Sequence, residues 1–406
     1  MDTHNGARNL CGSYTTCSAF DDQQTKIRRS SDTAWLDGLR GVAALLVVIQ
    51  HIHPAVWSLA MCNDVSDNST ATSPGTWPVL RLLFTGGSLA VELFFVISGF
   101  VVPRRLISLI QEGRQDDFVE ALNSAVIRRP CRLLIPAMLS TLVLLTFFHM
   151  TGIDPNWWVH AKYLVWLSLF GFSPSTSYEP SGECTQYAAF FAGMLTCELD
   201  LIRTSSEKAQ VRLPWSRISH YLAQRRFLRG LVMHTVLALG LIFASTPMAF
   251  LLVRHSPRSI LGEMAWHPIS YFWGAWLTIL GIKEIRWAKA IFETTIVQYL
   301  GRHSFALYLT HTLVTSTLTR VLLILTNHAF MHGEDAGWPF SAVTLGAWIK
   351  YLSLDMGPKG YEPAVLFVLA ASLAVIVPLA QIGTRIFDQP SVRIANWMWA
   401  KFKQLR

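Results

Sequence analysis

The chain is short of charge: only 15% of its 406 residues are Asp, Glu, Lys or Arg, whereas 51% are hydrophobic. A soluble protein of this size carries more charge, so a soluble globular domain is excluded. The six cysteines form no CxxC pair, which excludes a dense disulfide framework and a cysteine-based zinc site. The sequence also has no Walker loop, no dinucleotide-binding loop and no internal repeat of the kind that many transporters show.

The chain has instead a series of apolar runs close to the 20 or so residues that a membrane-spanning helix needs. We therefore expect an all-α fold, a polytopic transmembrane helical bundle of about 8 to 10 spans. The candidate spans are residues 37–57, 83–103, 132–150, 186–202, 230–253, 267–283, 303–326 and 363–387. Two shorter stretches, 160–172 and 341–354, are either interfacial helices or further spans.

The basic residues alternate between the loops that join these spans. Loops 104–131 and 203–229 are rich in Arg and Lys, whereas 58–80 contains neither and 151–185 contains a single Lys. Cytoplasmic loops carry the excess of basic residues, so this pattern predicts an even number of spans with both termini in the cytosol. The same rule explains the net charge of +8, and no nucleic-acid partner is expected.

We divide the chain into three parts. Residues 1–34 are polar and predict a disordered cytosolic tail, residues 35–390 form one membrane domain, and residues 391–406 form a basic cytosolic tail. The run after Arg28 suits a retained span, so no cleavable signal peptide is expected. Asn68 begins a glycosylation sequon in a loop expected on the side away from the cytosol.

The first span contains two polar residues, Arg40 and His51, in the segment DGLRGVAALLVVIQHIH. Eleven positions of helix turn through about 1100° and rise roughly 16 Å, so the two side chains share a face. Such residues inside hydrocarbon usually face a protein interior or a wet cavity. A neutral imidazole can take the proton of a hydroxyl as that hydroxyl attacks an acyl carbon, which makes His51 a candidate general base. The alternatives are a hydrogen-bonded core histidine and an arginine that snorkels to the headgroups.

The second span contains one acidic residue, Glu92, in the segment VELFFVISGF. If the first two spans are antiparallel neighbours, Glu92 and His51 lie at a similar depth. We hypothesise that Glu92 holds the tautomer of His51, as a base-orienting acid does. An unrelated hydrogen bond between helices is the alternative, and Ser98 and Gly99 favour close helix packing.

Three arginines, Arg128, Arg129 and Arg132, lie where the third candidate span leaves the cytosolic side, in the segment RRPCRLLIPA. Guanidinium groups in such a cluster can bind phosphates. The alternative is a positive-inside anchor without a ligand.

A later segment, LGRHSFALYLTH at 300–311, again combines an arginine with a histidine. Tyr308 and His311 share a helical face, whereas Arg302 lies on the opposite side of the helix from His311. His311 is then either part of the site or a histidine that fills the core.

Together these segments and the final FDQPSVR resemble the membrane-bound acyltransferase 3 family, in its fungal branch. They follow the order of that family over residues 35 to 393. The resemblance implies a membrane O-acyltransferase that moves an acyl group, usually acetyl, from acyl-CoA to a hydroxyl of a sugar, lipid or small metabolite. It also implies an integral membrane protein of the endoplasmic reticulum or plasma membrane, and secondary metabolism is the favoured setting.

The resemblance assigns roles to the candidate residues. It implies His51 and Glu92 as catalytic residues and Tyr308 and His311 as acceptor-binding residues. It implies that the acyl-CoA donor is bound by Arg40, Arg128, Arg129, Arg132 and Arg302. The family's terminal motif matches Asp388, Pro390 and Arg393. Acyl-CoA, acetyl-CoA above all, is then a co-substrate, and no bound cofactor or metal is expected.

The chain departs from the fungal pattern in its middle. Fungal members usually carry a tryptophan-rich block that ends in a Glu-Phe pair, together with an extra span, before the segment that reads FFAGM here at 190–194. This chain lacks that block. An inactive family member is therefore one alternative, and a transporter or flippase of similar architecture is another.

Overall fold

The computed structural model of the chain describes residues 33–52, 78–151, 180–209, 221, 224–245, 263–326 and 363–405. This part of the chain is helical apart from short turns, and it contains no strand. The all-α prediction is confirmed over these ranges. Asn68 and the short apolar stretches 160–172 and 341–354 lie outside the described residues.

A long helix covers half or more of each of the eight predicted spans. These helices are α2 (Ala34–Ile52), α4 (Pro78–Val101), α6 (Gln115–Thr151), α8 (Pro180–Ala209), α10 (Arg226–Ser245), α12 (Glu263–Glu284), α14 (Thr295–Val314) and α17 (Pro363–Gly383). Helix α14 continues through the π-helical turn η2 (Thr315–Thr319) into α15 (Arg320–Leu325). The shorter elements are α5 (Arg104–Gln111), α13 (Arg286–Phe292), the π-helical turn η4 (Thr384–Asp388) and α18 (Gln389–Leu405).

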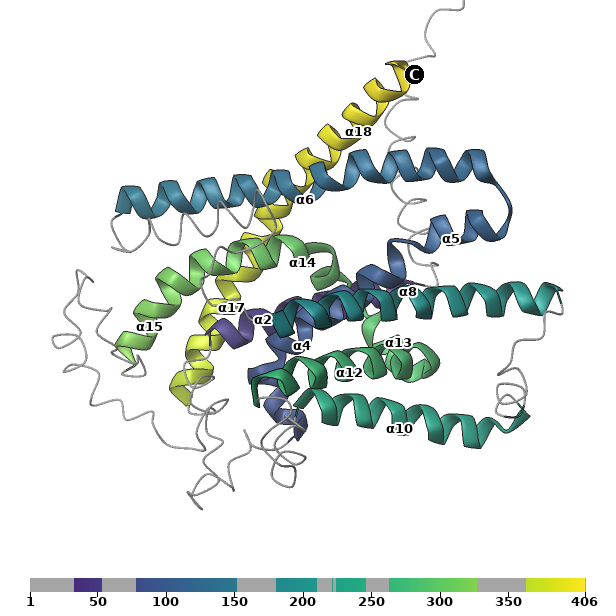
Figure 1. Cartoon of the computed structure of the whole chain (residues 1–406). Coiled ribbons are helices and arrows are strands. Elements are labelled where there is room, and N and C mark those ends of the chain that lie inside the picture. Colours follow the sequence, from purple (N-terminus) through teal and green to yellow (C-terminus); the bar gives the residue numbers. More distant parts are fainter. Residues whose placement is uncertain are drawn as a thin grey trace, which may run out of the picture.

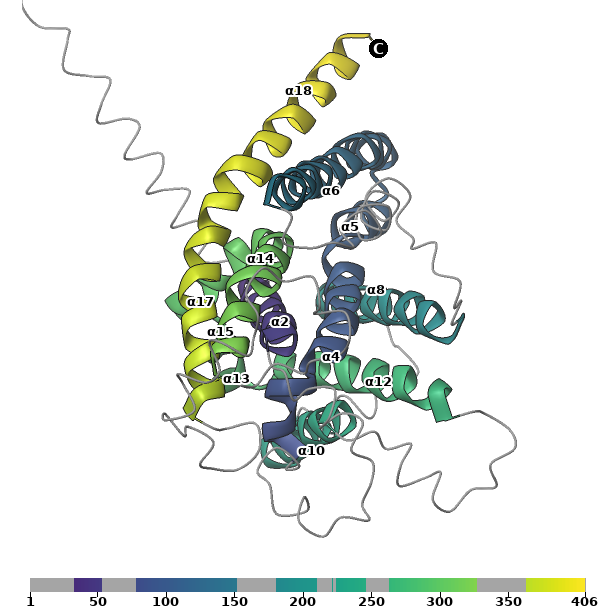
Figure 2. The same ribbon diagram turned by 90° about the vertical axis from the view of Figure 1, so that its left-hand side faces the viewer.

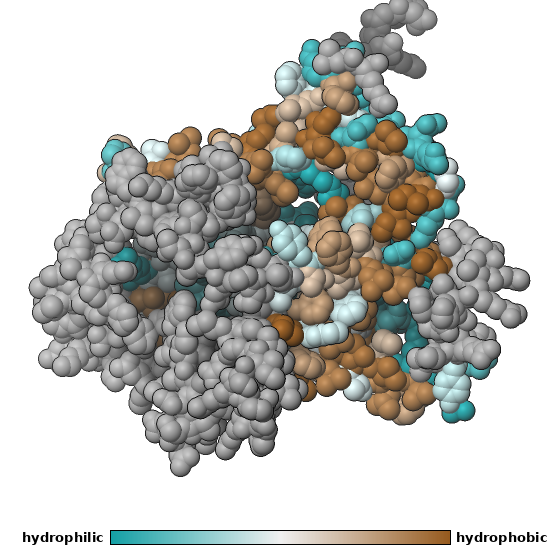
Figure 3. All heavy atoms as spheres, in the orientation of Figure 1, coloured by the Kyte–Doolittle hydropathy of each residue, from teal (hydrophilic) through white to brown (hydrophobic). Residues whose placement is uncertain are grey.

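The outer surface of the bundle is apolar where it must meet lipid. Among the described residues, five helical segments are long and apolar enough to cross a membrane: Ala34–Ile52, Gly86–Gln111, Gln115–Thr151, Arg226–Ser245 and Pro363–Gln404. Large apolar side chains are exposed on helix after helix, and Figure 3 shows them as a broad hydrophobic surface. Soluble monomers rarely expose contiguous apolar patches of this extent, because contact between apolar area and water is unfavourable. The protein is therefore an integral membrane protein.

Helix α2 lies at the centre of the bundle. It packs against α4 on one side and against α14 on the other (Figures 1 and 2). Helices α8 and α12 complete the first side, and α17 completes the second. Two buried apolar clusters fill these two interfaces, and α2 contributes to both. Helix α2 thus contributes to both clusters of the core.

Glycines set the closest helix crossings. A Cβ atom on Gly99 would lie 1.9 Å from the carbonyl oxygen of Phe190, and one on Gly193 would lie 2.1 Å from that of Val96. Only a residue without a side chain lets α4 and α8 approach so closely. The packing role expected for Gly99 in the SGF segment is confirmed.

A charge network joins α5, α8 and α12 beside the end of α4. The carboxylate of Asp200 pairs with Arg104 at 2.8 Å and with Lys283 at 2.5 Å. Both cations also lie over the ring of Phe100, at 5.2 and 5.7 Å from its centroid. The phenylalanine of the SGF segment therefore stabilises two cations by cation–π contact.

The C-terminal segment has a definite structure. Residues 391–405, expected as part of a basic tail, belong to α18, which follows α17 through η4 and packs on α6. Proline has no backbone N–H and its ring clashes with the carbonyl four residues earlier, so a wider π-helical turn just before Pro390 accommodates it. The segment is thus part of the bundle.

Candidate active site

Helices α2 and α14 are packed in parallel and in register. A Cβ atom on Gly41 would lie 2.4 Å from the backbone nitrogen of Gly301, so the two backbones touch there. Ten residues further along each helix, the rings of His51 and His311 meet with centroids 5.1 Å apart. Ten residues of α-helix rise about 15 Å, so the two helices stay together over that length. Two segments far apart in sequence therefore form one site.

Arg40 is bound to α14 at the glycine end of this interface. Its Nε donates to Ser304 Oγ at 2.9 Å and its Nη2 donates to the carbonyl of Gly301 at 3.0 Å. Arg40 also forms an ion pair with Asp37 at 3.3 Å, and 41% of the Arg40 side chain remains exposed. Arg40 thus clamps α2 to α14 and keeps donors for an anion. Sequence reasoning missed Ser304, although it lies inside the LGRHS segment.

The imidazole of His51 is held by its own helix. Its Nδ1 lies 2.8 Å from the carbonyl oxygen of Val47, which can only accept, so Nδ1 carries the hydrogen. The neutral ring then has its lone pair on Nε2, the form that a general base requires. Both Arg40 and His51 contact α14, which confirms that they share a face.

His311 is bonded in the same way. Its Nδ1 donates to the carbonyl of Tyr308 at 2.6 Å, and the ring is only 5% exposed. The rings of Tyr308 and His311 lie 5.7 Å apart, so these two residues share a face as predicted. Arg302 is exposed and makes no hydrogen bond within the described part of the chain.

The hydrogen bond expected between Glu92 and His51 is not formed. Glu92 is 5% exposed and its Oε1 accepts from Thr185 Oγ1 at 3.0 Å, so the carboxylate faces α8. Its Oε2 has no hydrogen-bond partner among the described residues. The reason lies in the register of α2 and α4. The side chain of Gln50 meets the backbone N–H of Gly87, and Glu92 lies five residues beyond that contact, about 7.5 Å along α4.

The arginines of α6 form a cluster with spare donors. Arg129 donates to the carbonyl of Val102 at 3.3 Å, and Arg128 donates weakly to Asn396 at 3.4 Å. Arg132 is exposed and has no hydrogen bond in the described ranges. The charges of Arg128 and Arg132 both act on Arg129, so the three groups lie close together. Such a group of guanidiniums suits phosphate oxygens.

A second basic group lies on α14 and η4, both of which contact α6. The charges of Arg302, Arg385 and Asp388 all act on His303, whose Nδ1 lies 2.8 Å from Thr384 Oγ1. The terminal motif therefore places Asp388 in the neighbourhood of His303, the residue next to Arg302. Three segments far apart in sequence contribute basic residues to neighbouring parts of the bundle.

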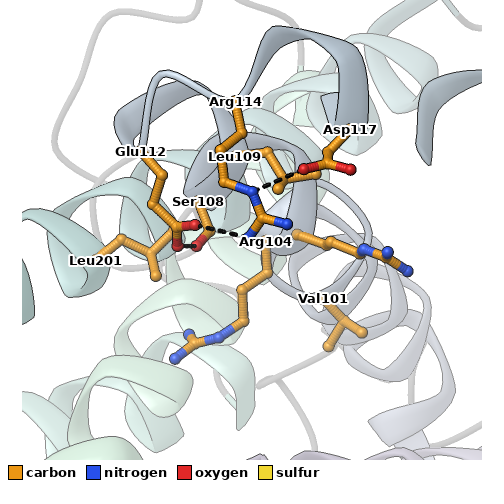
Figure 4. Close-up of a pocket in the computed structure, with 9 residues that line it drawn as sticks. Val101, Arg104, Ser108, Leu109, Glu112, Arg114, Asp117 and Leu201 are labelled. Atoms are coloured by element: carbon orange, nitrogen blue, oxygen red, sulfur yellow. Dashed lines mark hydrogen bonds and ion pairs between the residues drawn. The ribbon is translucent and has the colours of Figure 1, made fainter. Parts of the chain in front are cut away.

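A separate cavity of about 510 Å³ lies where α4, α5 and α8 meet (Figure 4). It is lined by Val101, Arg104, Arg105, Ser108, Leu109, Glu112, Arg114, Asp117 and Leu201. Arg114 pairs with Asp117 at 2.7 Å and with Glu112 at 3.2 Å. A hydrogen bond from Ser108, and after it the Arg114 guanidinium, lowers the pKa of Glu112 from its ordinary value.

This cavity is distinct from the site on α2 and α14. None of the residues singled out from the sequence lines it. Gly87 meets Gln50, the neighbour of His51, whereas Val101 in the cavity wall lies fourteen residues further along α4, about 21 Å away.

Comparisons with known proteins relate the chain to acyltransferases. The family model described as "Acyltransferase domain" matches residues 33–181. The O-acetyltransferase PaAT-1 of Phomopsis amygdali is 24% identical over 391 positions, which cover 75% of this chain and 76% of that protein. Acyltransferase R4 of a Phoma species and acyltransferase clz18 of Cochliobolus lunatus are each 23% identical, over 70% and 69% of this chain and 83% and 82% of their own lengths. No solved structure gives a significant match.

The helical membrane fold, the matched family and these relatives define the class of protein: it is an acyltransferase. The chain is similar to the acyltransferase family model over residues 33–181 and to fungal acyltransferases over about 70 to 75% of its length. An acyl donor and a hydroxyl-bearing acceptor follow from that class. The alignment with PaAT-1 is longer than the three quarters of this chain that take part in it. PaAT-1 therefore has residues without a counterpart here.

Proposed function

We propose that this protein transfers an acyl group, acetyl in the first instance, from acyl-CoA to a hydroxyl of a small metabolite, sugar or lipid. His51 is the general base. The observation that carries the proposal is the hydrogen bond from His51 Nδ1 to Val47, which leaves Nε2 free to accept a proton. PaAT-1, one of the relatives, is an O-acetyltransferase, which supports acetyl as the transferred group.

The reaction needs one base and no redox step. His51 Nε2 takes the hydroxyl proton as the acceptor oxygen forms its bond to the acyl carbon of the thioester. The carbon–sulfur bond then breaks, and the CoA sulfur leaves with the proton that His51 has carried. The products are an ester and free CoA, and His51 returns to its neutral form. Glu92 has no part in this step, because Thr185 holds its carboxylate on the side of α8.

In this proposal the arginines bind the phosphate end of acyl-CoA, so that its acyl end points toward His51. The phosphates of CoA bind Arg40, Arg302 and the α6 cluster at the cytosolic end, and the pantetheine arm extends along α2 toward His51. That arm is roughly as long as the 15 Å rise between the glycine contact and the histidine contact. Tyr308, whose side chain is 47% exposed, is available on the acceptor side.

The direct test is acyl transfer in membranes. Membranes that contain the protein should convert radiolabelled acetyl-CoA and a hydroxylated acceptor into a labelled ester, and membranes without it should not. Uptake of the acceptor without ester formation would favour a transporter or flippase. If no acceptor in a broad panel is acylated and no CoA is released, the protein is an inactive member of its family.

Loss of a donor-binding arginine should weaken acyl-CoA binding without slowing the chemical step. For Arg132→Gln we expect KM for acetyl-CoA to rise about tenfold with kcat within about twofold, since a charge-assisted hydrogen bond contributes about 1.5 kcal/mol. Initial rates over a range of acetyl-CoA concentrations give both constants. Arg225→Gln, at an exposed arginine that stacks on Tyr221, is the matched control. An unchanged KM in Arg132→Gln, or the same rise in the control, would remove Arg132 from the donor site.

We also propose 8 to 10 spans with both termini in the cytosol of an endoplasmic reticulum or plasma membrane protein. Eight long helices overlap the eight predicted spans, and five of these helices overlap segments long and apolar enough to cross a membrane, which supports a polytopic bundle. In sealed membrane vesicles with the cytosolic face outward, a protease should remove tags from both ends of the chain. Asn68, expected on the opposite side, should carry a glycan that an endoglycosidase removes. A tag protected at only one end would overturn the even number of spans.

A further inference from the structure

The contact between His51 and His311 has a role beyond packing. We propose that His311 is the positioning residue of the general base: its ring holds the ring of His51 so that Nε2 points at the acceptor hydroxyl. This inference rests on the proposed function of His51. It replaces Glu92, which sequence reasoning had given the task of orienting the base, with a residue on a different helix.

The ring of His51 needs a second support. The hydrogen bond to Val47 fixes the tautomer, but a single bond leaves the ring free to swing about it. The side chain of His51 is exposed, so burial does not hold the ring in place. The ring of His311, 5.1 Å away and inclined at 64°, supplies the missing constraint. Edge-to-face contacts between aromatic rings are favourable beyond the area that they bury.

His311 is itself held firmly enough to act as a support. Its ring is 5% exposed and its Nδ1 donates to Tyr308 at 2.6 Å, so it has little freedom of its own. One of the two imidazoles is therefore buried and fixed, and the other is exposed and available for reaction. That asymmetry assigns the base to His51 and the support to His311.

The crossing of the two helices fixes the distance between the rings. Gly41 touches Gly301, and Arg40 binds both Gly301 and Ser304. Both histidines then follow ten residues after the glycine contact, so the backbone places one ring beside the other. A misplacement of 1 Å in a reacting group can cost about 100-fold in rate, and a contact that prevents it has a large effect on kcat.

Two substitutions test separately whether His311 acts through its aromatic ring or through its polar nitrogens. For His311→Gln, which keeps a polar side chain but loses the ring, we expect kcat to fall about 10- to 100-fold. For His311→Phe, which keeps the ring, we expect kcat within about fivefold of the unchanged protein. In both variants KM for acetyl-CoA and for the acceptor should stay within about twofold, because a positioning residue acts on the reacting step. The matched control is His234→Ala, which removes an imidazole on α10 that is bonded to Trp287.

Each other result overturns the assignment. If His311→Gln keeps kcat within twofold, the ring is not needed. If KM for the acceptor rises at constant kcat, His311 binds the acceptor instead. If His311→Phe is as slow as His311→Gln, a ring nitrogen rather than the ring is required. His51→Ala, assayed in parallel, separates the two proposals. Full activity in His51→Ala overturns the assignment of His51 as the base. An inactive His51→Ala with an active His311→Gln overturns only the positioning role of His311.

Discussion

Replacing His51 with alanine is expected to lower the rate of acyl transfer by a factor of about 10² to 10⁴, the range that general acid–base catalysis contributes. Without the imidazole, no group at this position on α2 can take the proton of the attacking hydroxyl. KM for acetyl-CoA should change little, because Arg40, the proposed donor-binding residue on the same helix, lies eleven residues away, about 16 Å of helix rise. Initial rates of ester formation in membranes, at saturating acetyl-CoA, measure the effect.

The control for this variant must remove an imidazole without touching the site. His234 on α10 accepts a hydrogen bond from Trp287 at 3.0 Å and lies on a helix that does not contact α14 appreciably, so His234→Ala should keep full activity. His51 is exposed, so its replacement leaves no cavity in the core and the variant should accumulate normally. Turnover in His51→Ala equal to that of the control would end its assignment as the base.

The sequence predicted which residues share a face of a helix, but not which helix packs against that face. The eleven positions between Arg40 and His51 fixed a common face on the first span, because helical rotation depends only on spacing. Spacing carries no information on which helix lies opposite. The bond from Arg40 to Ser304 joins residues 264 positions apart, and only the fold shows it.

The contacts of Glu92 were likewise not predictable from the sequence. An acid and a histidine at similar depth suggested a pair, but the two helices meet in a register that turns Glu92 toward Thr185. The partner that His51 does find is the carbonyl of Val47, a backbone group that every residue carries and that no sequence pattern can single out. Side-chain patterns therefore singled out the proposed base but not the backbone group that holds its ring.

The closest contact between α2 and α14 is expected to be as important to activity as the base. For Gly301→Ala we expect a fall in kcat of at least about 100-fold, because a Cβ atom there would lie 2.2 Å from the carbonyl oxygen of Asp37 and must push the helices apart. The shift breaks the bonds of Arg40 to α14 and separates His51 from His311. Overpacking of this kind also costs about 1 to 3 kcal/mol of stability, which thermal unfolding of the detergent-solubilised protein measures.

A glycine with open space around it provides the control. Gly230 on α10 would have no heavy atom within 4 Å of an added Cβ, so Gly230→Ala should leave activity unchanged and should not destabilise the helix. The two variants make the same chemical change in two helices and differ in what the methyl group meets. If Gly301→Ala were as active and as stable as Gly230→Ala, α2 and α14 would not need to touch. The register that brings the two histidines together would then have no bearing on catalysis.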